Sequence, residues 1–232
     1  IIVDGRRRYL YHYVRIYTDQ GIYGTGEASH VDGGWRGSTQ TMAQQLIGQD
    51  PRDVDACFEG IRRSYIFRGG MAGLGISALT GLEMALWDLA GKAQGVPVYR
   101  LLGGKFRDRV RLYVDSAMTD CQERAEEARS KGFTAIKFDL DDAGNPHKAD
   151  AWNWSVTPGE LEIMVDQAHA IREAVGPHMD LAIDLHGRYD ATAGMKIAHE
   201  LEDLNLMWLE EPVPPENIQA MANITHSTKT PI

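Results

Sequence analysis

Hydrophobic and polar positions in the second half of the chain alternate between short apolar runs and longer amphipathic stretches. The short runs predict strands, and each is followed by a pattern typical of a helix. The expected strands are Val110–Asp115, Phe133–Asp139, Leu181–Asp184 and Leu206–Glu210, with Thr230–Ile232 as the start of another. The expected helices are Gln122–Lys131, Glu160–Val175, Ala193–Leu204 and Glu216–Thr225. Strands alternating with helices indicate βαβ units and a parallel sheet.

The parallel sheet is compatible with an open doubly wound fold or with a barrel. A Gly-x-Gly-x-x-Gly motif, which would indicate dinucleotide binding, does not follow the first strand. A closed (β/α)8 barrel needs roughly 250 residues of its own. If the fold is a barrel, the chain holds its first half only, and we expect it to be a fragment of a longer polypeptide.

The first hundred residues have a different pattern, with strands first and helices after. An antiparallel hairpin or meander is expected within Leu10–Glu27, and a glycine-rich loop within Ser29–Gln40. Helical periodicity then covers Thr39–Arg63, interrupted by Pro51, and a second loop covers Phe67–Leu74. A strong helix is expected from about Ser77, because Leu79, Leu82, Leu86 and Leu89 share one face. We therefore expect an α+β domain over residues 1–105 and an α/β domain over residues 106–232.

Composition excludes several classes of protein. The 232 residues are 43% hydrophobic and 25% charged, which is typical of a globular chain and not of a disordered one. The net charge of −9 argues against sequence-independent binding of nucleic acid. No apolar stretch reaches the roughly 20 residues of a membrane span, and the first residues do not resemble a signal peptide. Two cysteines cannot form a disulfide framework, so we expect a cytoplasmic protein.

Charged residues stand where the expected parallel strands end. Lys137 and Asp139 end one strand, Asp184 and His186 the next, and Glu210 the one after. Residues two apart on a strand share a face, and the carboxyl ends of parallel strands meet at one edge. Converging carboxylates repel one another unless a cation neutralises them, and Mg²⁺ prefers oxygen ligands. The alternative is that these acids cap helices or face water, as acids at strand ends commonly do.

Longer segments resemble a known enzyme family. ALTGLEMALWDLAGKAQGVPVYRLLGG, residues 78–104, is similar to a signature of the mandelate racemase/muconate lactonizing enzyme branch of the enolase superfamily. AIDLHGRYD and WLEEP resemble its first two metal-ligand segments, and IKFD resembles its catalytic lysine segment. The resemblance implies an N-terminal α+β capping domain followed by the first half of a (β/α)8 barrel. It also implies Asp184 and Glu210 as Mg²⁺ ligands, with a third acidic ligand on the next strand.

The resemblance implies removal of a proton α to a carboxylate, with Mg²⁺ stabilising the charge of the enediolate. Lys137 is the expected base, with a pKa lowered by the cation. Asp139 stands where many relatives carry a second lysine, so the alternatives are that Asp139 tunes Lys137 or that the base on this face has lost its role. A histidine two residues after the first ligand resembles the acid-sugar dehydratases, so His186 is the expected general acid for loss of a hydroxyl as water. The predicted reaction converts a sugar acid to a 2-keto-3-deoxy acid. A racemase, epimerase or cycloisomerase is the alternative, and a non-catalytic half-barrel module is a third reading.

The resemblance also indicates how substrate could be held. Two loops of the capping domain, Ser29–Gly37 and Phe67–Leu74, correspond to loops that close over the barrel mouth in the family. His30, Trp35 and Arg68 are therefore candidate substrate contacts, and Arg188 is a candidate for binding a carboxylate or hydroxyl. The expected partner is a small-molecule carboxylate, with no nucleic acid and no membrane, and the expected assembly is a homo-oligomer.

Overall fold

A computed structural model describes residues 12–28, 35–68, 72–116, 121–140 and 152–232. The chain divides into two compact units, Ile1–Asp108 and Arg109–Ile232, each with a core of its own. Among the described residues, no helix is both long enough and apolar enough to cross a membrane.

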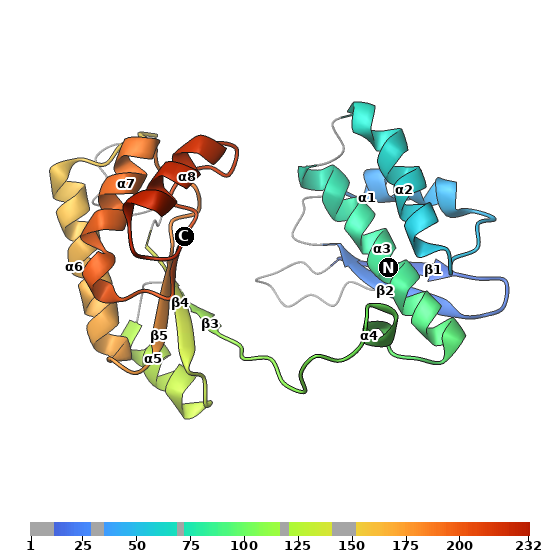
Figure 1. Ribbon diagram of the computed structural model, residues 1–232, viewed down its shortest axis with the longest axis horizontal. Helices are drawn as coiled ribbons and strands as arrows, with labels where there is room; N and C mark the ends of the chain where they lie inside the picture. Colours follow the sequence, from blue (N-terminus) through green and yellow to red (C-terminus); the bar gives the residue numbers. More distant parts are fainter. Residues whose placement is uncertain (1–11, 29–34, 69–71, 117–120, 141–151) are drawn as a thin grey trace. The chain divides into compact units, whose positions relative to one another are not determined.

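The first unit is built on an antiparallel hairpin covered by one long helix (Figure 1). Strands β1 (His12–Tyr17) and β2 (Tyr23–Ala28) pair along their whole length, and helix α3 (Gly73–Gln94) packs across β2. A β-carbon at Gly26 would overlap the carbonyl oxygen of Gly81 in α3. The helix can therefore lie this close to the strand only because that position has no side chain.

The first unit has further helices, several of which pack against α3. They are α1 (Trp35–Ala43), η1 (Gln44–Leu46), α2 (Val54–Tyr65), η2 (Ile66–Arg68) and α4 (Val98–Leu101). The expectation of a loop through residue 40 is wrong for residues 35–40, because Trp35, Thr39 and Met42 form a buried face at helical spacing. Helix α3 begins at Gly73 instead of Ser77, and part of the expected 67–74 loop is therefore helical. Ile76 packs against the same core and extends the apolar face by one turn.

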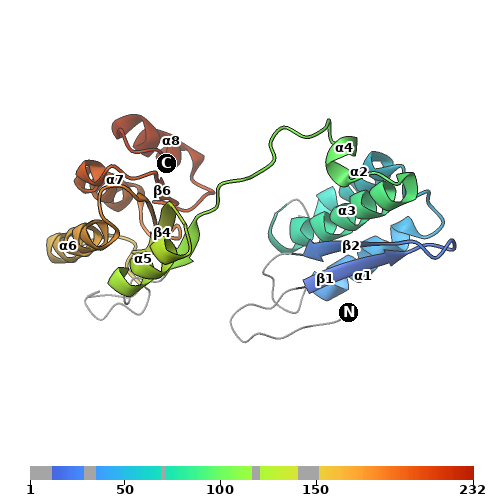
Figure 2. The same cartoon turned by 90° about the horizontal axis from the view of Figure 1, so that it is seen from below.

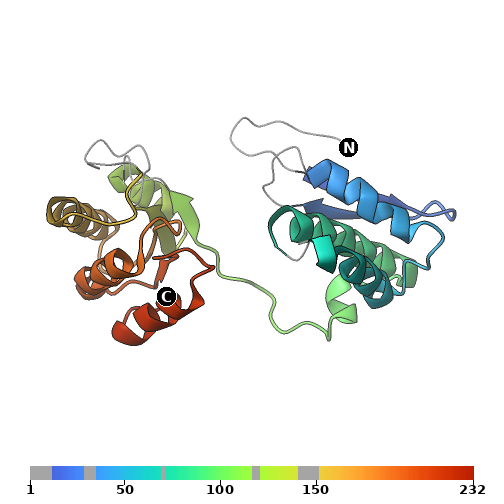
Figure 3. The same cartoon turned by 90° about the horizontal axis from the view of Figure 1, so that it is seen from above.

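The second unit is a four-stranded parallel sheet in the order β3-β4-β5-β6, which is half of a barrel. Its strands are β3 (Val114–Ser116), β4 (Ala135–Asp139), β5 (Asp180–Asp184) and β6 (Trp208–Glu210). Its helices are α5 (Cys121–Ser130), α6 (Pro158–Val175), α7 (Ala191–Glu200), η3 (Glu202–Leu204) and α8 (Ile218–Ser227). Figures 2 and 3 show the helices in chain order along one face of the sheet. Among the described residues, no helix of this unit lies on the other face of the sheet (Figures 2 and 3).

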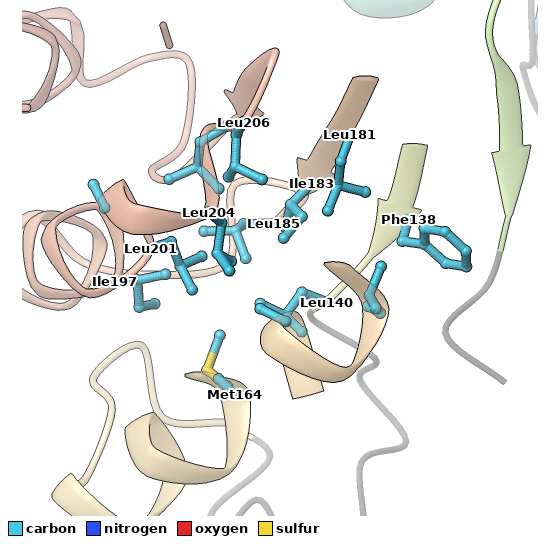
Figure 4. Packing of buried hydrophobic residues seen from close by; sticks show 14 of the residues in the cluster. Phe138, Leu140, Met164, Leu181, Ile183, Leu185, Ile197, Leu201, Leu204 and Leu206 are labelled. Atoms are coloured by element: carbon cyan, nitrogen blue, oxygen red, sulfur yellow. The ribbon is translucent and has the colours of Figure 1, made fainter. Parts of the chain in front are cut away.

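The core of the second unit lies between the sheet and its helices. Phe138 on β4 and Leu181 and Ile183 on β5 are fully buried and belong to the cluster of apolar side chains drawn in Figure 4. Met164 of α6 and Ile197 of α7 belong to the same cluster. Because side chains alternate along a strand, the residues between these apolar positions point to the opposite face. That face carries the charged residues.

Two ends of the sheet differ from the sequence prediction. Only Val114–Ser116 pairs with β4, so the strand expected at 110–115 is shorter and begins later. Arg111 lies before this strand and contacts the sheet through its side chain. Its guanidinium donates to Thr134 Oγ1 at 2.8 Å and to Asp180 Oδ2 at 2.6 Å. Residues 230–232 are not assigned as a strand, although the Leu209 backbone N–H donates to the Pro231 carbonyl at 2.8 Å on the far side of β6.

Candidate active site

Three acidic side chains lie in one row across the sheet. Asp139 on β4 pairs in register with Asp184 on β5, and Asp184 pairs with Glu210 on β6. All three end their strands, as the sequence predicted from the position of each acid after an apolar run. The exposed fraction of Asp184 is only 4%, so its charge needs a partner inside the protein.

Lys137 supplies that partner. Its Nζ lies 2.7 Å from Asp184 Oδ2 and 3.2 Å from Glu210 Oε2, and it also lies 3.8 Å from Asp115 Oδ1. The Lys137 and Asp184 side chains are 11% and 5% exposed, which makes this a buried ion pair. One ammonium therefore joins the acids that end β5 and β6.

The charges around this pair shift its protonation equilibria. Burial alone would raise the pKa of Asp184, but hydrogen bonds from Lys137 and from the His186 backbone N–H outweigh it and hold that pKa below its ordinary value. Burial alone would lower the pKa of Lys137, but the hydrogen bonds and charges of Asp184 and Glu210 raise it. Burial raises the pKa of Asp139, with a further contribution from Asp115 and Asp184. Beside these carboxylates the pKa of Lys137 is therefore raised. The lowered pKa expected from the sequence requires a bound cation and stays a prediction.

His186 stands at the start of the loop between β5 and α7. Its backbone is left-handed, with φ of 51°, and its N–H donates to Asp184 Oδ1 at 2.9 Å. Its Nε2 lies 3.7 Å from Asp184 Oδ2 and 4.0 Å from Asp139 Oδ1. The imidazole thus faces two carboxylates, one on β4 and one on β5.

The loop that carries His186 is bonded to the loop after β6. The Gly187 N–H donates to the Glu211 carbonyl at 2.8 Å, and Glu211 is itself left-handed, with φ of 44°. A β-carbon at Gly187, whose φ is 63°, would lie 3.3 Å from Pro214 Cα. Left-handed backbone at residues other than glycine is costly, and it is common at functional sites.

The donor atoms fit a hard divalent cation. Asp184 Oδ2 and Glu210 Oε2 both approach one cationic nitrogen, so the two carboxylates converge on a point that already holds positive charge. A second group overlaps the first, because single ligand atoms of Asp139, Asp184 and His186 lie within 4.8 Å of one another. Asp184 belongs to both groups and is therefore the strongest candidate for a metal ligand. The oxygen-rich pair Asp184 and Glu210 suits Mg²⁺ better than the group with an imidazole.

The sequence analysis did not identify Asp115, Trp208 or Tyr113 as residues of this site. Trp208 Nε1 donates to Glu210 Oε2 at 2.9 Å, and the Tyr113 ring meets the Trp208 ring edge-on with centroids 5.4 Å apart. The position of Trp208 two residues before Glu210 is a signal that could have identified it, because such residues share a strand face.

The remaining predicted residues lie in both units. Arg188 is exposed in the β5–α7 loop, one residue beyond Gly187. Trp35 is 3% exposed in the first unit, where it packs in the core and lies 4.6 Å from His12 between ring centroids. Arg68 ends η2 in the first unit. His30 lies outside the described residues.

Two family models match the chain. Residues 3–103 match the mandelate racemase/muconate lactonizing enzyme N-terminal domain, and residues 120–232 match the enolase C-terminal domain-like family. The chain is 40% identical over 238 residues to a D-xylonate dehydratase from Haloferax volcanii, covering 100% of this chain and 57% of the relative. It is 35% identical over 189 residues to a D-gluconate dehydratase from Thermoproteus tenax, covering 78% of this chain and 36% of the relative. The match thus covers 57% of the first relative and 36% of the second, less than two thirds of either.

Solved structures agree with this assignment. A mandelate racemase/muconate lactonizing enzyme-like protein from Rubrobacter xylanophilus matches with a TM-score of 0.89 and 45% identity, over 96% of this chain and 62% of that one. A 3,6-anhydro-D-galactonate cycloisomerase from Zobellia galactanivorans matches with a TM-score of 0.82 and 25% identity, over 96% of this chain and 59% of that one.

Proposed function

Because the chain belongs to the mandelate racemase/muconate lactonizing enzyme branch of the enolase superfamily, we propose that the protein dehydrates a sugar acid to a 2-keto-3-deoxy acid. The observation that carries the proposal is the meeting of Lys137, Asp184 and Glu210 at the carboxyl ends of three strands. The names of its relatives, D-xylonate and D-gluconate dehydratase, support dehydration over other reactions of the family.

Asp184 and Glu210 are the proposed ligands of Mg²⁺. When bound, the cation would draw electron density from the substrate carboxylate and so make the neighbouring C–H bond more acidic. The third ligand expected in the family stays a prediction. Removing either carboxylate would leave the cation with one fewer negative ligand, so we expect either loss to weaken Mg²⁺ binding.

Lys137 is the proposed base for the proton α to the carboxylate, and Asp139 is the proposed group that tunes it. A base must be the neutral amine, so the contacts of Lys137 with Asp184 and Glu210 have to loosen when substrate is bound. His186 is the proposed general acid. The α C–H bond and the β C–O bond both break, the β-hydroxyl leaves as water with the proton from His186, and the resulting enol tautomerises to the 2-keto acid.

Arg188 is a proposed contact for a substrate carboxylate or hydroxyl, since it comes after His186 and Gly187 in the same loop and is exposed. His30, Trp35 and Arg68 are proposed contacts from the capping domain. Of these, Trp35 contributes to the core of its own unit, so its contact with substrate would involve only the accessible remainder of its ring.

The test is an assay of the whole protein with Mg²⁺ and a panel of sugar acids that includes D-xylonate, D-gluconate and D-galactonate. We expect a 2-keto acid that reacts with semicarbazide, and its loss in Asp184→Asn and Glu210→Gln. Lys196→Met, which alters an exposed lysine on α7, is the control and should leave the rate unchanged. A well-folded protein that forms no keto acid from any member of the panel contradicts the proposal.

An isomerisation on the same scaffold is the second candidate, and the cycloisomerase among the structural neighbours favours it. The two reactions share removal of the α proton and differ in whether water is then lost from the substrate. Exchange of that hydrogen with deuterium from solvent, without release of a keto acid, would support isomerisation and count against dehydration.

A further inference from the structure

We propose that Trp208 is a positioning residue for Glu210, whose carboxylate it orients through a hydrogen bond from its indole N–H. The Trp208 Nε1 to Glu210 Oε2 distance is 2.9 Å. The inference deepens the proposed function and rests on it in one respect, namely that Glu210 is a ligand of the divalent cation.

The geometry of strand β6 makes this contact direct. Trp208 and Glu210 are two residues apart on one short strand, and their side chains therefore point the same way. An indole nitrogen donates one hydrogen bond and accepts none, and it does not ionise in the ordinary pH range. The donor is thus constant, whatever the protonation state of its neighbours.

In the row of residues below the acids, Trp208 approaches Glu210 more closely than Lys137 does. Lys137, Ala182 and Trp208 lie side by side across β4, β5 and β6. The small Ala182 stands between these two larger side chains, and both of them contact Glu210. Lys137 divides its ammonium between Asp184 at 2.7 Å and Glu210 at 3.2 Å and longer, whereas the single N–H of Trp208 is committed to Glu210.

Tyr113 holds the indole from the segment that leads into β3. The two rings meet at 77° with centroids 5.4 Å apart, which is a favourable edge-to-face contact. The ring contact limits rotation of Trp208, and the hydrogen bond limits rotation of Glu210. One oxygen of Glu210 is then fixed by two donors, while the other has only a 3.3 Å contact with Lys137 among the described residues.

The first experiment measures Mg²⁺ binding to the whole protein by calorimetry. Trp208→Phe keeps an aromatic ring and removes the N–H. Partners of metal ligands typically change metal affinity by roughly 10- to 100-fold when they are removed, so we expect the Kd for Mg²⁺ to rise by about that factor, and kcat to recover at saturating Mg²⁺. Trp87→Phe is the matched control, because Trp87 Nε1 donates to Glu83 in the first unit and its loss should leave the Kd unchanged. An unchanged Kd in Trp208→Phe overturns the inference.

The second experiment does not depend on the metal. Crystal structures of the whole protein and of Trp208→Phe, both in EDTA, would compare the orientation of the Glu210 carboxylate. We expect it to rotate in the variant while Asp184 stays in place. If the parent protein binds no Mg²⁺, the proposed function fails, yet this comparison still decides the inference, because an unmoved Glu210 carboxylate overturns it.

Discussion

Replacing Lys137 with methionine should destabilise the protein most at neutral pH and least in acid. Methionine keeps most of the apolar stem but removes the ammonium that joins Asp184 and Glu210. Because the two side chains of the Lys137–Asp184 pair are 11% and 5% exposed, the carboxylate left behind is buried and lacks its cation. Breaking a buried pair in this way costs about 3–5 kcal/mol.

The pH dependence results from the pKa shifts of the pair. In the parent protein the pKa of Asp184 is lowered, so its contribution to stability is present above the unfolded value of about 3.9 and is lost as pH falls through the lowered one. The pKa of Lys137 is raised, so its contribution is complete below about 10.4 and is lost only in strong base. In the variant, Asp184 keeps its burial without Lys137 and takes up a proton more readily. The difference between the two proteins should therefore shrink as pH falls toward about 4.

Thermal unfolding of the whole protein in EDTA between about pH 4 and pH 8 measures this effect. A loss of 3–5 kcal/mol corresponds to a fall in Tm of roughly 6–20 °C for a domain of 150–250 residues. Lys196→Met should change stability by no more than about 0.5 kcal/mol, as exposed substitutions usually do. Added Mg²⁺ should raise the Tm of Lys137→Met, because it can replace the missing charge. A variant that melts with the parent at every pH would refute the assignment of a buried, stabilising pair.

The remaining predictions concern a close packing contact in the first unit and the reactivity of the two cysteines. Gly26→Ala should lower Tm strongly, because the added β-carbon would overlap the Gly81 carbonyl and push α3 off the hairpin. Gly60→Ala in α2 is the control, because a β-carbon there meets open space and should be neutral or stabilising. Thermal melts of the two variants check this contrast. Burial, with a smaller effect of nearby carboxylates, raises the pKa of the Cys57 thiol, so iodoacetamide at neutral pH should label the more accessible Cys121 first. Mass spectrometry of the labelled peptides would show the order, and equal labelling would contradict the burial of Cys57.

The sequence was sufficient to predict the part of the site that depends on strand order. Parallel strands bring their carboxyl ends to one edge, so an acid or a lysine at the end of each apolar run must meet its neighbours there. Lys137, Asp184 and Glu210 are together for that reason. The same argument predicts that His186 lies near this edge but does not predict the direction of its ring. That direction depends on the left-handed backbone of the loop and not on the strand.

Other features depend on contacts that no local pattern reports. Residues 35–40 are rich in small and polar types that are typical of a loop, and only the burial of Trp35 and Met42 against α3 makes them helical. The direction in which the pKa of Lys137 is shifted could not be predicted either, because it depends on how many carboxylates contact its Nζ. The whole protein's location and homo-oligomeric state stay predictions.

The hydrogen bond between Gly187 and Glu211 has a practical consequence for engineering. It joins two loops that belong to different βα units, and both depend on left-handed backbone to make the join. Altering the length of either loop on its own would leave the other without its anchor. A redesign of this chain toward a new substrate should therefore replace the β5–α7 loop and the loop after β6 together.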